Sequence, residues 1–172
     1  MPVWRGGGRE PNIGSVAGIF TKVRLRPSQL RTIADRRFGD AQCLCDSRQN
    51  ERANGAMYMA GFVIEILLKS RLMEKYPWLQ TTRSPEKLSS SDRALWSLCY
   101  RSHDLAGLLE QLSEIRQILK LREPHGSERL WRILKSICAR WSVFARYSPQ
   151  STRMTEADEF VRQIKEIKEC LR

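Results

Sequence analysis

The sequence predicts an all-α protein, built as an up-and-down helical bundle of four to five helices. After residue 26, apolar residues recur at spacings of three and four, which is typical of helices with one buried face. No stretch alternates apolar and polar residues as a strand does, and no hairpin signal or internal repeat is present. The 172 residues are 41% hydrophobic and 28% charged, which suits one domain with a sizeable core.

The N-terminal residues differ in composition from the rest. Residues 1–26 are rich in Gly and interrupted by Pro, so we interpret them as a flexible tail, or as the result of a wrongly assigned start codon. They contain no apolar core of a secretory signal. The helical domain is expected over residues 27–172.

The first two expected helices carry the longest apolar pattern. Pro27 and Ser28 form a helix start. The stripe that follows is Leu30, Ala34, Phe38, Ala41 and Cys45. The second helix runs from about Asn50 to Tyr76, and its first half is apolar on every side, as in a membrane span or the centre of a bundle. Its apolar run over 56–68 is shorter than the ~20 residues a bilayer requires, so we expect the centre of a bundle.

The remaining helices follow a polar loop at 79–92 and a short helix near 92–100. A helix over 102–121 is expected to start at Ser102 as N-cap. Two more helices are expected. The first carries its apolar stripe over 130–144 and is ended at Pro149, and the second runs over 155–171 with Thr155 and Asp158 as a capping box. Their expected buried residues are Leu105, Leu108, Leu112, Ile115 and Leu119, then Leu130, Ile133, Leu134, Ile137, Trp141 and Phe144, and finally Phe160, Ile164, Ile167 and Leu171.

The formal charge of +11 suits nucleic acid or another anionic partner, or simply a solvated basic surface. The same two interpretations apply to a basic helix face opposite the apolar stripe of 130–144, formed by Arg129, Arg132, Lys135 and Arg140. The five cysteines are scattered and form no CxxC pair or His/Cys cluster, so we expect free thiols in a reducing cytoplasm, no metal and no cofactor.

Glu65 stands in the middle of the apolar run. Three interpretations are open: a surface pair with Lys69 one turn later, a buried polar anchor, or part of a functional pocket. Tyr58 and Phe62 lie on the same side of the expected helix and leave Glu65 little contact with water. A carboxylate in this position therefore needs a charged or hydrogen-bonding partner. Arg146 is a candidate partner, because arginine can bind a carboxylate through two hydrogen bonds. Its alternative is a solvated cation at a helix end.

His103 and Asp104 stand at a helix start, where the pair could supply a general base, contact RNA or simply order the junction. His125 is expected to be an exposed loop residue. No phosphate-binding loop, HExxH, GxSxG or Cys–His catalytic pair is present.

Three segments together resemble the HEPN (higher eukaryotes and prokaryotes nucleotide-binding) domain family. "YMAGFVIEILLKSRL" is similar to the family's long helix, with a Glu and, four residues later, a Lys. "SHDLAGLL" resembles its His-Asp-Leu segment, and "RWSVFARYSP" with "EADEFVRQIKEI" resembles its Arg-Tyr segment and final helix. The matching residues are Glu65, Lys69, His103, Asp104, Arg146 and Tyr147.

The resemblance implies a helical bundle, often a homodimer, with a cleft for RNA or nucleotide. It also implies a toxin–antitoxin or defence context with a nucleotidyltransferase or antitoxin protein as partner. Catalytic members are metal-independent endoribonucleases with an Arg, four to six residues and then a His. That motif is missing, because residues 96–98 before His103 and 118–120 before His125 contain no Arg.

The leading hypothesis is therefore a cytoplasmic binding module for RNA, a nucleotide or a nucleotidyltransferase-type partner, without a membrane segment. The first alternative is an endoribonuclease with a rearranged site, in which His103 and Arg146 are the candidate catalytic residues. The second is a structural or regulatory interaction module.

Overall fold

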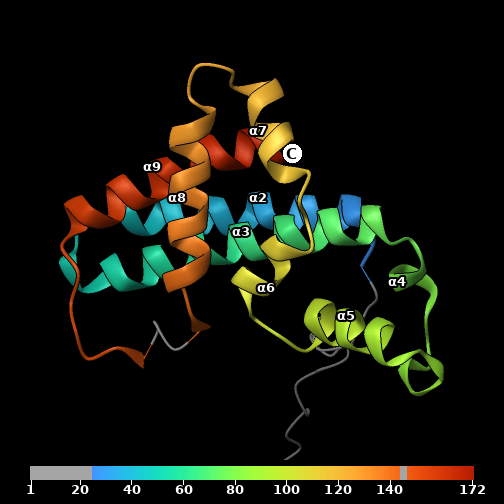
Figure 1. Ribbon diagram of the computed structural model, residues 1–172. Helices are drawn as coiled ribbons and strands as arrows, with labels where there is room; N and C mark the ends of the chain where they lie inside the picture. Colours follow the sequence, from blue (N-terminus) through green and yellow to red (C-terminus); the bar gives the residue numbers. More distant parts are fainter. Residues whose placement is uncertain (1–24, 144–146) are drawn as a thin grey trace, which may run out of the picture.

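The computed structural model describes residues 25–143 and 147–172 (Figure 1). The described residues form helices and no strand, which confirms the all-α class. They contain eight α-helices, so the expected four to five helices in an up-and-down order are not confirmed. The helices are α2 (Pro27–Asp46), α3 (Ala53–Lys75), α4 (Trp78–Thr81), α5 (Ser90–Tyr100), α6 (Leu105–Glu110), α7 (Ile115–Arg122), α8 (Ser127–Arg140) and α9 (Met154–Leu171), with 3₁₀ turns at Asn50–Arg52 and Pro85–Lys87. The expected tail lies outside the described residues, except for residues 25 and 26.

The long helices α2, α3 and α9 form the centre of the fold. Figure 1 shows α2 and α3 side by side, with α9 beside them and α8 crossing in front. The Ser70 hydroxyl in α3 donates to the Pro27 carbonyl at 3.0 Å, so α2 and α3 run antiparallel. The expected stripe of α2 is buried throughout, and α3 is buried on most of its circumference. The prediction that residues 56–68 form the centre of the bundle is confirmed.

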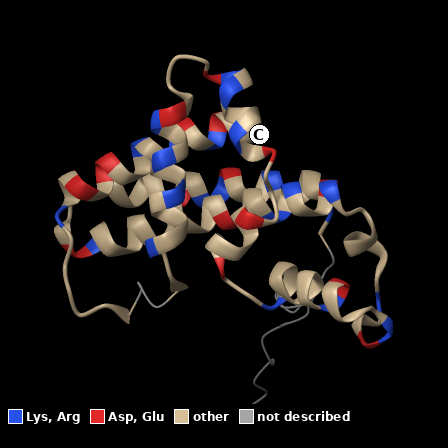
Figure 2. Ribbon diagram, viewed as in Figure 1, with Lys and Arg blue, Asp and Glu red and all other residues tan. Residues whose placement is uncertain are grey.

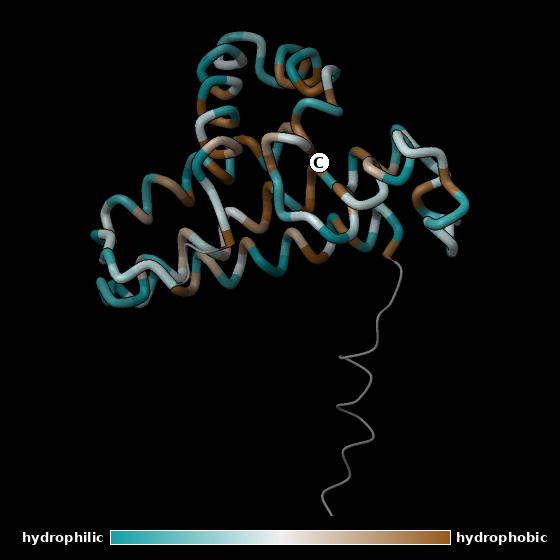
Figure 3. Tube along the Cα trace, turned by 60° about the horizontal axis from the view of Figure 1, so that its bottom comes forward, coloured by the Kyte–Doolittle hydropathy of each residue, from teal (hydrophilic) through white to brown (hydrophobic). Residues whose placement is uncertain are grey.

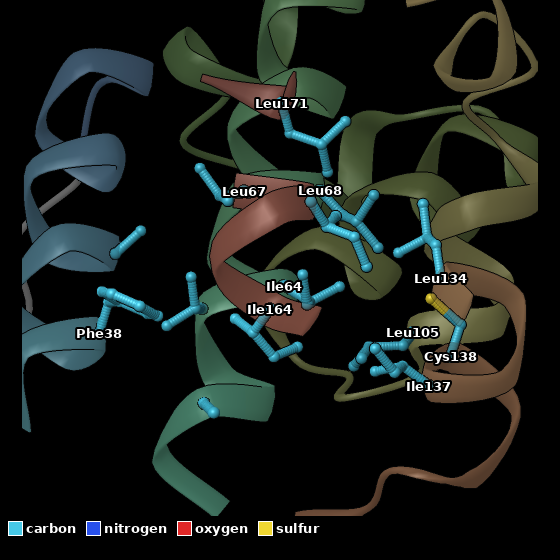
Figure 4. Packing of buried hydrophobic residues seen from close by; sticks show 14 of the residues in the cluster. Phe38, Ile64, Leu67, Leu68, Leu105, Leu134, Ile137, Cys138, Ile164 and Leu171 are labelled. Carbon is cyan, nitrogen blue, oxygen red and sulfur yellow. The ribbon is translucent and has the colours of Figure 1, made fainter. Parts of the chain in front are cut away.

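Side chains from several helices meet in one core. Figure 4 shows Phe38 of α2, Ile64 and Leu68 of α3, Leu134 of α8 and Ile164 of α9 pointing toward a common interior. Figure 3 shows hydrophobic and hydrophilic residues alternating along the long helices, as expected when one face is buried. No helix among the described residues combines the length and apolar character that crossing a membrane requires.

The helices α2 and α9 each begin with a side chain that accepts a hydrogen bond from the backbone N–H just before the helix. The Gln29 side chain accepts from the Arg26 backbone N–H at 2.8 Å, and Pro27 is the first residue of α2, which confirms the expected start. The expected Thr155–Asp158 capping box is wrong. α9 starts one residue earlier, and the Glu156 carboxylate accepts from the Arg153 N–H at 3.1 Å. Asp158 instead forms an ion pair with Arg48.

The helix expected over 102–121 is interrupted. It separates into α6 and α7, and the residues between them bend so that Leu112 stays fully buried. The Lys75 ammonium donates to the Gln111 carbonyl at 2.6 Å and pairs with Glu114 at 2.9 Å. The break is therefore stabilised by the end of α3, because Lys75 satisfies a carbonyl that has lost its helical partner.

Two local expectations near α5 and α6 are also corrected. The N-cap of α6 is Asp104, whose carboxylate accepts from the Gly107 N–H at 2.9 Å. Ser102 is not the cap; its hydroxyl accepts from the Asp104 N–H at 2.9 Å. The loop expected at 79–92 contains α4 and a 3₁₀ turn, and Tyr100 of α5 donates to the Leu79 carbonyl at 2.7 Å.

Candidate functional site

Glu65 is buried although it is charged. Its exposed fraction is 3%, so the interpretation as an exposed surface pair is wrong. Its position in α3 follows from the helix period, because Tyr58, Phe62, Glu65 and Lys69 are spaced by four, three and four residues and share one face. This side of α3 faces the linker between α5 and α6, because residues of that linker form hydrogen bonds with it.

Lys69 supplies the charge that Glu65 requires. Its ammonium donates to the Glu65 carboxylate at 2.7 Å and to the Ser102 carbonyl at 2.8 Å. The Lys69 side chain is 15% exposed, so the pair is largely removed from water. A buried carboxylate is tolerated when its charge is paired and its lone pairs are filled. The second bond also ties the α5–α6 linker to α3.

His103 completes the cluster. Its Nδ1 lies 3.0 Å from both Glu65 carboxylate oxygens. Because an ionised carboxylate only accepts hydrogen bonds, Nδ1 carries the proton and donates it to Glu65. The imidazole is 49% exposed, and its Nε2 forms no hydrogen bond with the described residues. The cluster therefore presents an oriented imidazole whose Nε2 is available to a ligand.

A row of aromatic rings adjoins this imidazole. Phe62 forms edge-to-face contacts with two rings. Its centroid lies 6.0 Å from that of His103 and 5.2 Å from that of Trp141. Tyr58 lies 4.9 Å from Phe62 and 6.1 Å from Trp141. Tyr58, Phe62 and Trp141 are half-buried. We call these three residues the aromatic row.

The structure brings together only part of the expected set. Glu65, Lys69 and His103 form one cluster. Asp104 follows directly, but its carboxylate caps α6. Tyr147 is described and is 66% exposed. Arg146 lies outside the described residues, so the proposed Glu65–Arg146 pair stays a prediction.

Trp141 has a role that the sequence analysis missed. It was expected as a core residue of a helix that continues to Pro149, and as part of the segment that resembles the HEPN family; the helix, α8, instead ends at Arg140. In the structure it follows α8 directly, and its indole lies against Gly61. A Cβ at Gly61 would be 1.8 Å from the indole nitrogen, so only glycine leaves space for the ring. The one signal in the sequence was a glycine in the middle of a helix, which often marks a close contact.

The basic face of α8 is exposed as expected. Its residues are Arg129, Arg132, Lys135 and Arg140. Arg129 forms an ion pair with Glu166, and Lys135 lies 5.6 Å from the centre of the Trp131 ring. His125 is exposed in the turn between α7 and α8, as expected.

The buried cysteines are unreactive. All five cysteines are free thiols, and only Cys43 is exposed. Burial raises the pKa of the Cys138 thiol to about 12 and that of Cys99 to about 11, so both stay protonated at neutral pH. Within residues 25–143 and 147–172, no group of three or more His, Cys, Asp and Glu residues is arranged to hold a metal ion.

Trp141 also lines a groove of about 510 Å³ between α3, α8 and α9. It is mainly apolar, with Met57, Ile137 and Phe160 among its lining residues, and it includes no residue of the Glu65 cluster. We therefore place the candidate site at His103, where the titratable groups converge, and not in this groove.

Comparison of this chain with protein family models, with curated proteins and with solved structures finds no match.

Proposed function

We propose that this protein is an RNA-binding helical domain whose site is centred on His103. The supporting observation is the oriented imidazole beside the aromatic row. Single-stranded RNA is bound by aromatic side chains that stack on its bases and by polar or cationic groups that contact its phosphates. His103 supplies a donor or acceptor for the phosphate or 2′-hydroxyl, and the aromatic row supplies ring surface. The charge of +11 favours the approach of a polyanion.

The cluster also supports a second function, metal-independent endoribonuclease activity. A carboxylate that accepts from Nδ1 holds an imidazole in the tautomer whose Nε2 can accept a proton. His103 would then take the proton of the 2′-hydroxyl. Arg146 would stabilise the negative charge on the phosphate, as the family resemblance suggests. Glu65 and Lys69 would position His103 and would not touch the substrate.

The wider context rests on the resemblance alone. It suggests membership of the HEPN family, a homodimer, and a toxin–antitoxin or defence role with a nucleotidyltransferase or antitoxin partner. A nucleotide is the smaller ligand that the same site could hold. A structural or regulatory interaction module, without a ligand, is the alternative that the RNA experiment excludes if binding occurs.

The test is binding of a fluorescently labelled single-stranded RNA to the wild type and to His103→Ala. We expect the variant to bind at least about fivefold more weakly, which corresponds to one hydrogen bond of about 1 kcal/mol. His125→Ala is the matched control, because it removes the second histidine from an exposed turn far along the chain. Equal affinity of all three proteins would reject the proposed site.

Catalysis is tested separately with the same RNA. Cleavage by the wild type, and its loss in both His103→Ala and Arg146→Ala with His125→Ala unaffected, would support the endoribonuclease. Identical background cleavage in all four proteins would reject it and leave the binding function standing.

A further inference from the structure

A second cavity lies beside α5, and the two arginines that line it have no acidic partner among the described residues. The cavity has a volume of about 570 Å³ and lies between α5 and the 3₁₀ turn Pro85–Lys87. Arg93, Trp96 and Arg101 line it, and Glu86 is the one acidic residue among its described lining residues. Neither arginine forms an ion pair with a carboxylate of the described chain. Two unneutralised guanidinium groups beside one cavity favour an anionic ligand.

Arg93 is held in place by backbone carbonyls. Its Nη2 donates to the Glu86 carbonyl at 2.8 Å and to the Leu88 carbonyl at 3.3 Å, and its Nε donates to the Pro85 carbonyl at 3.3 Å. Carbonyl groups position the guanidinium without neutralising its charge. No described group accepts a hydrogen bond from its Nη1, so those donors remain for a ligand.

Arg101 is held by an aromatic ring. Its guanidinium carbon lies 5.0 Å from the centre of the Trp96 ring, and Tyr100 contacts the same ring at 5.1 Å. A cation–π contact with the ring face uses none of the guanidinium N–H groups, so these remain available for a bidentate contact with a ligand. The indole of Trp96 thereby positions the Arg101 guanidinium to bind an anion such as phosphate.

The cavity is close to the His103 site along the chain. Arg101 is the C-cap that follows α5, and His103 stands two residues later, so their Cα atoms are no more than about 7 Å apart. Ser102, between them, is anchored through its carbonyl to Lys69. Figure 2 shows basic residues near both ends of α5. Arg101 and His103 are therefore near neighbours in the α5–α6 linker, as two contacts on one RNA strand require.

We propose that the α5 cavity is a second phosphate-binding subsite, in which Arg101 and Arg93 hold a phosphate of the single-stranded RNA that also contacts His103. This inference rests on the proposed function and extends it: the RNA path runs from the aromatic row past His103 to α5. Arg101 makes the bidentate contact, and Arg93 supplies the second charge.

The first experiment measures the salt dependence of RNA binding. The logarithm of the binding constant falls with the logarithm of the salt concentration, with a slope of about −0.7 for each phosphate contact to a single strand. Arg101→Gln is expected to make the slope shallower by about 0.7. Arg122→Gln is the control, because it removes a charge that is also exposed from the end of α7, which Figure 1 shows far from α5. An unchanged slope in Arg101→Gln would overturn the subsite.

The second experiment separates the two sites by nuclear magnetic resonance. The indole N–H signal of Trp96, assigned with Trp96→Phe, reports on the cavity, and the ring protons of His103 report on the first site. We expect both signals to shift when the same RNA is added. A shift at His103 alone overturns the subsite and leaves the proposed function intact. A shift at Trp96 alone overturns the His103 function and, with it, the proposed RNA path from His103 to α5. No shift at either residue overturns both sites.

Discussion

Gly61 is the residue of α3 against which the Trp141 indole lies. An alanine Cβ here would lie 1.8 Å from the Trp141 indole nitrogen, so the ring has to move. We expect Gly61→Ala to lower the free energy of unfolding by about 1–3 kcal/mol. The measurement is urea denaturation.

Gly39 offers a matched control for this substitution. It lies inside α2, and a Cβ there would meet nothing within 4 Å. Gly39→Ala is expected to stabilise the protein by about 0.5–1 kcal/mol, because alanine has the better helix propensity. Two glycine-to-alanine changes with the same sign would contradict the close contact between Gly61 and Trp141.

Glu65 determines how the candidate site is held together. Glu65→Gln keeps the shape of the side chain but removes the charge that Lys69 and His103 both face. We expect the free energy of unfolding to fall by about 1–3 kcal/mol, because Lys69 then loses its carboxylate. Glu110→Gln, on the exposed end of α6, is the control and is expected to have little effect. If Glu65→Gln is as stable as the wild type, the buried contacts of the carboxylate contribute little to the free energy of unfolding.

At the scale of elements, the junction between α5 and α6 depends on one cap. The Asp104 carboxylate accepts from the Gly107 N–H, and this bond fixes where α6 begins and so where His103 stands. Asp104→Ala is expected to cost about 1 kcal/mol in thermal or urea unfolding. Asp104→Asn retains an acceptor and is expected to lose much less. Equal losses in the two variants would argue against the cap.

The same elements show where reasoning from the sequence failed. The apolar positions Leu108, Leu112 and Ile115 were correctly expected to be buried, but the helix through them is broken. Their spacing is the same whether the chain continues as one helix or bends. The bend is stabilised by Lys75, which belongs to another helix, so the sequence of this segment alone does not reveal it.

At the scale of the whole molecule, the buried thiols predict a loss of stability at alkaline pH. Burial raises the pKa of Cys45 and Cys99 to about 11 and that of Cys138 to about 12, from 9.0. The folded state therefore keeps protons that the unfolded state releases above pH 9. Stability is expected to be unaffected by these thiols below that pH and to fall as the pH rises toward 11.

Urea denaturation at several pH values tests this prediction. Each thiol contributes up to about 1.4 kcal/mol per pH unit above pH 9. Cys138→Ala is expected to make the decline shallower. Cys43→Ala is the control, because Cys43 is exposed. The prediction is wrong if the two variants decline with the same slope.

The sequence alone determined the helical class, the buried stripes of the long helices and the central position of α3. These features are local, because the spacing of apolar residues along one helix decides which face is buried. It also singled out Glu65, Lys69 and His103 as residues of interest, though not how they contact one another. Only the tertiary structure decided that a buried Glu65 binds His103, 38 residues away, and that Trp141 covers Gly61. These contacts depend on how separate helices pack, and the period of a single helix carries no information about its neighbours.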